Sequence, residues 1–223
     1  MIVQLSILLS QICYGRTINI HLKVDSIVEE LSLQYNQQIR KYDPTMQIFF
    51  ETVHQPHITL YMTNFQEGCE PTLRRVLQKT TQNLKSGKVF MEKAYASGSY
   101  AMWNSTIDSY IQTLSDTIVN ATRHLAVQDQ PVPQWVLDIK DDVVRERKIK
   151  YVKEYGSPNV FEEFGPHVTL GFDSDTKALA AAMKRVKVAP TTYQSLVVAM
   201  GTAGPFGTVL RGRDLGYFYL SSS

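Results

Sequence analysis

The sequence contains few of the features that mark common classes of enzyme or binding protein. Only two of its 223 residues are cysteine, so at most one disulfide can form and the fold must depend on a hydrophobic core. No group of Cys, His and Asp residues has the spacing of a zinc site. A phosphate-binding P-loop and a G-x-S-x-G nucleophile motif are also missing, which excludes the enzyme classes that these motifs identify.

A strong excess of charge is missing as well. The chain has 23 Lys and Arg against 21 Asp and Glu, a net charge of +2. This balance is too mild to indicate a protein that tracks a long polyanion, but it is compatible with a small anionic ligand. Hydrophobic residues make up 43% of the chain, and its length is enough for one large domain or two tightly joined lobes with an ample core.

The apolar N-terminus is too short to span a bilayer. Residues 1–14 carry no charge, and Cys13 and Gly15 are small residues at the end of this run. The pattern predicts a secretory signal peptide over residues 1–15, followed by a single domain of two lobes over residues 16–223. It departs from the usual signal because it has no Lys or Arg near its start, and the alternative is a buried strand or helix.

Two glycosylation sequons agree with export, although such triplets also arise by chance. They begin at Asn104 and Asn120 and predict a glycoprotein. Secretion or residence in the endomembrane lumen is therefore expected, with the cytoplasm as the alternative. If Cys13 is removed with the signal, Cys69 has no partner within the chain.

A five-residue motif occurs twice in the chain. Residues 56–60 are Pro-His-Ile-Thr-Leu, and residues 166–170 are Pro-His-Val-Thr-Leu. The histidines of the two copies, His57 and His167, are 110 residues apart, about half of the chain. Each copy lies in a run of β-branched, Leu and aromatic residues, which predicts a strand. One such motif would most simply be a core segment, but two copies are difficult to attribute to chance.

Side chains alternate across a strand, so the His and Thr of each copy share one face. This places His57 beside Thr59, and His167 beside Thr169, with the apolar residues of each motif directed to a core. Tyr61 continues the face of the first pair and is a candidate to line a cleft. The other two isolated histidines, at positions 21 and 124, are expected on the surface.

Hydrophobic periodicity predicts interleaved strands and helices in both halves of the chain. Capping-box spacing predicts helix starts at Ser26 and Ser105. The Pro-rich segment 130–133 is a plausible crossing between the halves. Strands are expected near residues 17–24, 46–50, 58–62, 89–100, 135–139, 168–172, 196–200 and 217–220, and helices near residues 26–42, 70–84, 105–125, 140–154 and 173–186.

This order predicts an α+β fold of two lobes related by approximate internal duplication, facing each other across a groove. The highly charged helix near residues 140–154 is interpreted as a solvated helix in preference to a binding surface. Residues 201–207 are rich in glycine and predict a loop that frames a pocket. Phe206 in this loop is a candidate to stack on a nucleobase.

The paired motifs resemble those of the 2H phosphoesterase superfamily, which is named for two such histidine motifs. The resemblance is specific at residues 57–60 and 167–170 and diffuse over the rest of the chain after about Thr17. It implies two pseudo-symmetric lobes, each an antiparallel sheet with helices outside, around a central cleft that receives one motif from each lobe. It also implies catalysis without a metal or another cofactor. Superfamily members act on cyclic nucleotides, RNA ends or 2′,5′-linked oligoadenylates.

Two histidines that face each other across a cleft suit the cleavage of a phosphodiester. One neutral imidazole takes a proton from the attacking oxygen, and the other, protonated, gives a proton to the leaving oxygen. His57 and His167 are therefore the predicted catalytic acid/base pair, with neither role assigned to either residue. Thr59 and Thr169 are predicted to donate to non-bridging phosphate oxygens. The attacker is water for a 2′,3′-cyclic phosphate, or the neighbouring 3′-hydroxyl for a 2′,5′ linkage.

The resulting hypothesis is a metal-independent phosphodiesterase, expected to be a monomer, that acts on a small nucleotide or short oligonucleotide. One alternative is an intracellular RNA-end processing enzyme or ligase of the same fold. Another is a nucleotide-binding module without catalytic activity, although such a module would have no need of both His/Thr pairs.

Overall fold

The computed structural model describes residues 15–222. The predicted signal peptide over residues 1–15 lies outside the described residues except for Gly15. Within the described part of the chain, no helix is both long and apolar enough to cross a membrane.

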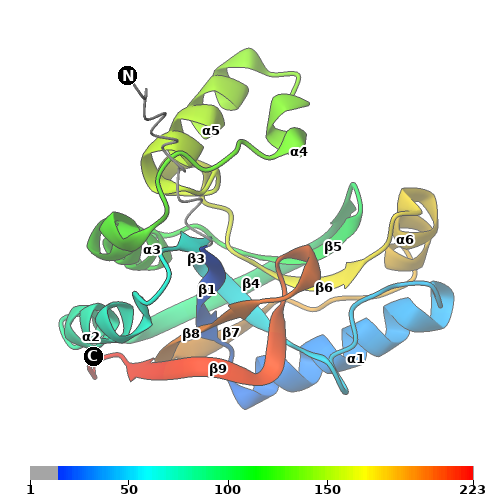
Figure 1. Cartoon of the computed structure of the whole chain (residues 1–223). Helices are drawn as coiled ribbons and strands as arrows, with labels where there is room; N and C mark the ends of the chain where they lie inside the picture. Colours follow the sequence, from blue (N-terminus) through cyan, green and yellow to red (C-terminus); the bar gives the residue numbers. More distant parts are fainter. Residues whose placement is uncertain (1–14, 223) are drawn as a thin grey trace, which may run out of the picture.

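Two curled antiparallel sheets form the centre of the molecule (Figure 1), which confirms the predicted α+β class. Neighbouring strands in both sheets pair antiparallel. The first sheet contains, in order, β2 (His54–Gln55), β9 (Val209–Tyr219), β8 (Val197–Ala203), β1 (Arg16–Lys23) and β3 (His57–Phe65). The second contains, in order, β6 (His167–Phe172), β5 (Tyr100–Ser105), β4 (Gly87–Ser97) and β7 (Thr191–Ser195).

Helices cover both sheets. The α-helices are α1 (Ser26–Tyr42), α2 (Glu70–Thr81), α3 (Ser109–Thr122), α4 (Gln134–Leu137), α5 (Asp142–Tyr155) and α6 (Thr176–Met183), and the short 3₁₀ helices are η1 (Arg123–Leu125), η2 (Phe161–Glu163) and η3 (Pro205–Gly207). Helices α1 and α6 pack on the second sheet, and α2 and α3 on the first. Helices α4 and α5 pack on each other and project away from the sheets (Figure 1).

The two sheets are not the two halves of the sequence. Strands β8 and β9 return from the C-terminal part of the chain to pair beside β1, while β4 and β5 pair with the later strands β6 and β7. The expected crossing between halves at residues 130–133 is therefore wrong. Hydrophobic periodicity indicates which face of a segment is buried but not which distant strand the segment pairs with. The local sequence therefore could not predict that strands from both halves of the chain would pair in one sheet.

Two segments predicted as strands have other conformations. Residues 46–50 are irregular, and their alternating Met46, Ile48 and Phe50 are buried without belonging to a strand. Residues 135–139 were also expected to be extended, but the structure places α4 there. In both cases a short apolar run fits more than one local structure.

Two helix starts differ from the prediction. Asp25, and not Ser26, caps α1 by accepting from the Val28 backbone N–H, and Asp108 caps α3 in the same way through Ile111. Ser105 lies instead at the end of β5. A carboxylate directly before a helix accepts a hydrogen bond from a backbone N–H that has no partner within the helix. Its negative charge also interacts favourably with the positive, N-terminal end of the helix dipole, which explains why aspartate caps both helices.

The hydrophobic core is continuous between the two sheets. It contains the apolar residues of both motifs, because Ile58, Leu60, Val168 and Leu170 are all fully buried. The predicted apolar face of each motif strand is thus confirmed. Its burial directs the histidine and threonine of the same strand to the opposite face.

Candidate active site

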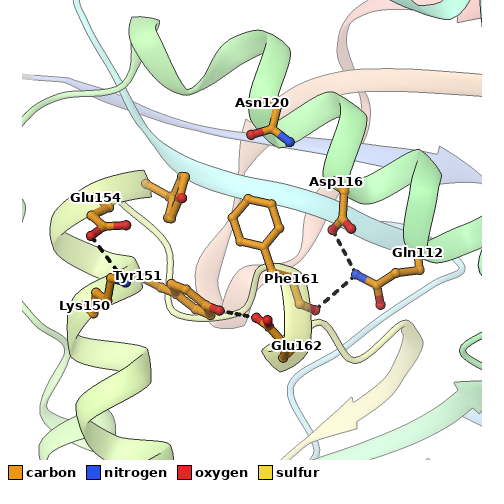
Figure 2. A pocket seen from close by; sticks show the side chains of 9 residues that line it. Gln112, Asp116, Asn120, Lys150, Tyr151, Glu154, Phe161 and Glu162 are labelled. Carbon is orange, nitrogen blue, oxygen red and sulfur yellow. Dashed lines mark hydrogen bonds and ion pairs between the residues drawn. The ribbon is translucent and has the colours of Figure 1, made fainter.

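A cavity of about 510 Å³ lies between α3, α5 and η2 (Figure 2). Two aromatic side chains, Tyr151 and Phe161, and the carboxylate of Asp116 help to form its walls. Its other lining residues are Gln112, Asn120, Lys150, Glu154, Tyr155 and Glu162. None of these residues belongs to either H-x-T-L motif, so this cavity is separate from the candidate active site.

The two histidine motifs lie on edge strands that meet. Strand β3 is at one edge of the first sheet and β6 at one edge of the second, and the two strands pack against each other. His57 and His167 begin these strands. Burial is the main cause that lowers the pKa of His57, and the charge of His167 is a smaller one. The structure thus brings together the two residues that the repeated motif singles out.

Strand β3 has a bulge at the leucine of its motif. Thr59 lies opposite His21 on β1, and Tyr61 lies opposite Ile20, so Leu60 is left without a partner residue. A bulge of this kind interrupts the alternation of side chains along the strand.

Strand β6 has the same irregularity at the same motif position. Thr169 lies opposite Met102 on β5, Gly171 lies opposite Ala101, and Leu170 is left over. The internal duplication therefore extends from the sequence of the motif to its backbone. Each bulge occurs directly after the H-x-T triplet and separates it from the rest of its strand.

The bulge turns Tyr61 away from the candidate site. Tyr61 shares the core face with Ile20, is 1% exposed and donates its hydroxyl to the Tyr155 carbonyl. Burial also raises the pKa of Tyr61. The prediction that Tyr61 lines the cleft is wrong, because it assumed uninterrupted alternation. Met62, opposite Asn19, occupies the face that Tyr61 was expected to take.

The hydrogen bonds of His57 define its tautomer. Its Nδ1 lies 2.9 Å from the Gln55 carbonyl, which can only accept, so Nδ1 carries a proton. Its Nε2 lies 3.3 Å from the Asn19 amide nitrogen, which can only donate, so Nε2 presents a lone pair. Burial, and then the charge of His21, lowers the pKa of His57 to about 3. His57 is therefore neutral near pH 7 and has the form required of a proton acceptor.

His167 is held by the same kind of backbone contact. Its Nδ1 lies 2.7 Å from the carbonyl of Gly165, two residues earlier, as Gln55 is two residues before His57. Burial lowers the pKa of His167 as well. Within residues 15–222 no side chain hydrogen-bonds its Nε2, which leaves that nitrogen available to a ligand.

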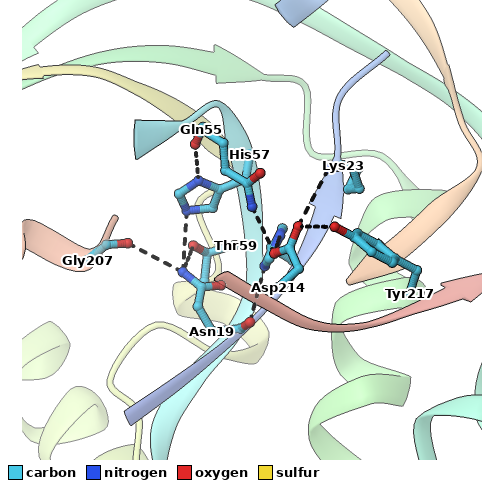
Figure 3. A network of polar contacts seen from close by, with 9 residues as sticks. Asn19, Lys23, Gln55, His57, Thr59, Gly207, Asp214 and Tyr217 are labelled. Carbon is cyan, nitrogen blue, oxygen red and sulfur yellow. Dashed lines mark hydrogen bonds and ion pairs between the residues drawn. The ribbon is translucent and has the colours of Figure 1, made fainter. Parts of the chain in front are cut away.

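A buried polar network lies behind His57 (Figure 3). Its centre is Asp214 on β9, which accepts a 2.8 Å hydrogen bond from Gln55 and a 2.9 Å bond from Tyr217. Its carboxylate also lies 3.5 Å from His21 Nε2 and 3.7 Å from Lys23 Nζ. Burial by itself raises the pKa of Asp214, but the nearby His21 ring and the hydrogen bond from Gln55 hold it at about 2. Asp214 is therefore a permanent negative charge at neutral pH.

His21 is fully buried, so its expected surface position is wrong. Its ring meets that of His57 edge-on, with centroids 5.2 Å apart. Sequence reasoning missed Asn19, His21 and Asp214 as site residues. The alternation of residues 17–24 did place the first two on one polar face, but nothing in the local sequence indicated that β9 would cover that face with a carboxylate.

Phe206 lies in a loop that contacts both parts of the site, which we call the His57 half-site on β3 and the His167 half-site on β6. Its ring stacks on that of Phe172 at the end of β6, with centroids 3.9 Å apart and planes inclined by 15°. The next residue, Gly207, provides a carbonyl 3.4 Å from the Asn19 amide beside His57. The φ of Phe206 is +61°, a left-handed conformation that is uncommon for a residue other than glycine and that occurs at functional sites more often than elsewhere.

The described residues contain no group of three His, Cys, Asp or Glu side chains placed to hold a metal ion. Thr59 and Thr169 are both half-buried, and each lies two residues after the histidine of its motif on the same strand. The arrangement is a pair of imidazoles, each anchored through Nδ1 and each with a threonine on the same strand face. It can move protons and donate hydrogen bonds to an anion held between the strands.

Comparison with known proteins agrees with this arrangement. The family model described as the 2′-5′ RNA ligase superfamily matches residues 27–200. No curated protein sequence matches the chain.

The fold is similar to that of several solved structures. It matches TT0787 of Thermus thermophilus with a TM-score of 0.60 at 13% identity, over 93% of this chain and 99% of that one. It also matches E. coli LigT in its apo form, with a TM-score of 0.57 at 10% identity and the same coverage. LigT complexed with ATP gives a TM-score of 0.56 at 9% identity, again over 93% and 99%. At these identities the similarity establishes the fold alone.

Proposed function

The chain belongs to the 2′-5′ RNA ligase superfamily of 2H phosphoesterases, and on that premise we propose that it hydrolyses a nucleotide phosphodiester by two-histidine acid/base catalysis. The proposed substrate is a 2′,3′-cyclic phosphate or a 2′,5′-linked oligonucleotide. The observation that carries the proposal is the matched anchoring of the two imidazoles. Each donates Nδ1–H to the carbonyl two residues earlier, on edge strands that meet, which turns both Nε2 atoms away from that carbonyl. Among the described residues the Nε2 of His167 has no hydrogen-bond partner, and that of His57 lies 3.3 Å from the Asn19 amide nitrogen.

His57 is assigned as the base and His167 as the acid. The unprotonated Nε2 of His57 removes a proton from the attacking water while the new P–O bond forms. In a 2′,3′-cyclic phosphate the bond from phosphorus to the 2′ or 3′ oxygen breaks. In a 2′,5′ linkage the neighbouring 3′-hydroxyl attacks in place of water, and the bond from phosphorus to the 5′ oxygen breaks. In both cases protonated His167 gives its Nε2 proton to the leaving oxygen. A bound phosphate anion favours the protonated form of His167, since an opposite charge nearby raises the pKa of an imidazole.

The two threonines are assigned to the developing negative charge. Thr59 and Thr169 lie two residues after the histidines on the same strand faces, about 7 Å along each strand. A hydroxyl at that distance can donate to a non-bridging phosphate oxygen. A donor that faces charge present only in the transition state lowers the barrier more than it strengthens substrate binding.

Phe206 is assigned to the nucleobase. Its ring stacks on Phe172 of β6, and the carbonyl of the next residue, Gly207, lies beside Asn19. One face of a nucleobase can lie against this aromatic pair. Base stacking tolerates any base, so this contact supports binding without fixing base preference.

A cleavage assay tests the proposal directly. The full chain is incubated with 2′,3′-cyclic nucleotides, 2′,5′-linked oligoadenylate and a 3′,5′-linked oligonucleotide as control, with and without EDTA. Chelator-resistant cleavage of either proposed substrate, lost in His57→Ala and His167→Ala, is the expected result. His124→Ala is the matched control because His124 is an exposed histidine outside the site. Joining of RNA ends without hydrolysis would favour the ligase alternative, and tight binding without any reaction would favour the binding module.

Export of the protein is a separate proposal. An N-terminus of the mature chain near residue 16, measured by mass spectrometry of secreted material, is the expected outcome, while an intact Met1 would favour the cytoplasm. Of the two sequons, Asn120 is exposed on α3, whereas the Asn104 amide donates to the Tyr95 hydroxyl from within β5. A glycan is therefore expected at Asn120 and not at Asn104.

A further inference from the structure

Asn19 is a fully buried amide within the His57 half-site (Figure 3). It lies on β1, opposite Met62. Its Nδ2 is 2.9 Å from Thr59 Oγ1, 3.3 Å from His57 Nε2 and 3.4 Å from the Gly207 carbonyl. One side chain therefore touches a histidine, a threonine and the loop that carries Phe206.

The contact with Thr59 determines the role of its hydroxyl. An amide nitrogen only donates, so Thr59 Oγ1 is the acceptor in this hydrogen bond. The hydroxyl proton is then free, and it can be donated to another group. A threonine whose oxygen is already occupied in this way is prepared to donate to a phosphate oxygen, which is the role assigned to it above.

The contact with His57 has a similar consequence. The amide N–H faces Nε2, which accords with a lone pair on that atom and with the proton on Nδ1. The opposite tautomer would direct two N–H groups at each other and leave Nδ1 facing a carbonyl. Asn19 therefore favours the one tautomer in which His57 can accept a proton through Nε2.

The partners of Asn19 distinguish it from an asparagine with a purely structural role. Asn19 Oδ1 is buried and accepts from no described residue, but the same is true of Asn36 Oδ1. The difference is that Asn19 Nδ2 faces the histidine and the threonine of one motif, whereas Asn36 donates only to backbone carbonyls.

Among residues 15–222, the half-site of His167 has no amide at the equivalent position. The residue that occupies the corresponding position is Tyr100 on β5, which lies opposite Phe172 as Asn19 lies opposite Met62. Tyr100 packs edge-on against Phe172, with ring centroids 5.0 Å apart. The feature is thus particular to the His57 side and is not a property of the repeated motif.

We infer that Asn19 is a positioning residue for the proposed phosphodiester chemistry. It holds the Thr59 hydroxyl as a donor toward the substrate and stabilises the His57 tautomer that has its lone pair on Nε2. The inference rests on the proposed function. Any change at Asn19 should consequently alter the turnover number and its pH dependence more than substrate affinity.

Other charged groups around His57 must be considered in a pH experiment. His21 and Lys23 face it from β1, Asp214 from β9 and His167 from β6. The charges of His21 and His167 lower the pKa of His57, and that of Asp214 raises it. None of these groups is altered in the variants below, so a shift between variants reports on position 19.

Asn19→Asp and Asn19→Ala test the inference together. In Asn19→Asp the new carboxylate accepts a hydrogen bond from the Thr59 hydroxyl, which then no longer donates to the substrate. The kcat should therefore fall about 100-fold, as for a lost oxyanion donor. The carboxylate also places a negative charge beside His57 Nε2. The same charge should move the acid limb of kcat/KM upward by about 1 pH unit or more. Asn19→Ala should lower kcat by roughly 10-fold or more without the upward shift, and KM should change by less than about 3-fold in both.

Asn36→Ala is the matched control. Asn36 is another fully buried asparagine, but its amide donates only to the carbonyls of Ile48 and Leu170. Its loss is expected to lower Tm while leaving the acid limb in place. A further readout is the combination of Asn19→Ala with Thr59→Val, which should cost little more than Thr59→Val alone because both remove the same donor function.

A measurement without substrate separates this inference from the proposed function. The His57 imidazole is titrated by NMR in the wild type and in Asn19→Asp, with signals assigned by their loss in His57→Ala. An upward shift of the His57 titration in Asn19→Asp is expected even if no phosphodiester is cleaved. An active enzyme in which both Asn19 variants retain wild-type kcat, or an unshifted His57 titration, overturns the inference and leaves the proposed function standing. An inactive wild type with a shifted titration overturns the proposed function and leaves only the electrostatic contact between positions 19 and 57.

Discussion

The two halves of the site share a motif but differ in their surroundings. His57 is 7% exposed and is surrounded by the polar side chains of Asn19, His21 and Gln55, with Asp214 behind them. His167 is more exposed, and the neighbouring Thr169 lies opposite the apolar Met102. The stacked rings of Phe172 and Phe206 complete that side.

The comparison separates what the motif determines from what its neighbours determine. Both copies give the same strand position, the same bulge after the triplet and the same Nδ1 contact with a carbonyl two residues earlier. These features orient an imidazole. The protonation of the imidazole depends on the neighbours. Burial lowers the pKa of both histidines, and the charge of His21 lowers that of His57 further. One repeated motif can therefore supply two different chemical roles.

The largest effect is expected from removing either histidine, and the leaving group should distinguish them. His57→Ala and His167→Ala should each lower kcat by roughly 100- to 10,000-fold on a natural diester. A p-nitrophenyl phosphodiester needs no proton on its leaving oxygen, so it should restore much of the activity of His167→Ala but not of His57→Ala. Rescue of the His57 variant instead would reverse the assigned roles, and equal rescue of both would remove the distinction between the halves.

The two threonine variants should also differ from each other, with smaller losses of kcat than the histidine variants. Removal of one oxyanion donor costs about 100- to 1,000-fold in kcat at a well-formed site. Thr59→Val should approach that range because Asn19 holds the Thr59 hydroxyl as a donor. Thr169→Val should cost less, about 10-fold to 100-fold, since no amide orients its hydroxyl. Steady-state kinetics on one substrate provide the comparison, and a larger loss at Thr169 would contradict it.

Asp214 should contribute to stability in a pH-dependent way. Its pKa is about 2 in the folded protein against an ordinary value of 3.8, so the folded state favours the ionised carboxylate. This contributes on the order of 2 kcal/mol above about pH 4, and the contribution is lost as pH falls through about 2. Asp214→Asn should therefore lower the free energy of unfolding by about that amount at pH 7.

Urea denaturation of both proteins at pH 7, 5 and 3 measures this contribution. The difference between wild type and variant should be nearly constant from pH 7 to 5 and smaller at pH 3. A difference that does not depend on pH would mean that the network acts through packing and not through charge.

The smallest effect is expected at Phe206. Replacing it with Leu removes an aromatic surface beside the His167 half-site and should raise KM by roughly 5- to 20-fold, with kcat changed by less than about 3-fold. A matched replacement, Phe90→Leu, alters an exposed phenylalanine on β4 and should change neither constant. Loss of kcat without a change in KM would indicate that Phe206 positions its loop and does not bind the nucleobase.

The repeated motif was sufficient to predict the strands, their buried face and the meeting of the two strands that carry His57 and His167. Strict alternation failed at Tyr61 because the bulges at Leu60 and Leu170 are tertiary features that a local pattern does not show. Asn19 and Asp214 were missed for a related reason. They reach His57 only after β1, β3 and β9 assemble in one sheet, and such long-range pairing leaves no trace in hydrophobic periodicity.

The most direct test is whether both imidazoles bind one phosphate. The ring signals of His57 and His167 are followed by NMR while adenosine 3′-monophosphate is added to the full chain at constant pH. If the two half-sites hold a shared anion, both signals should move with a single dissociation constant, in the direction of protonation for at least one ring. Movement of only one histidine, or two different dissociation constants, would contradict a site built from both motifs.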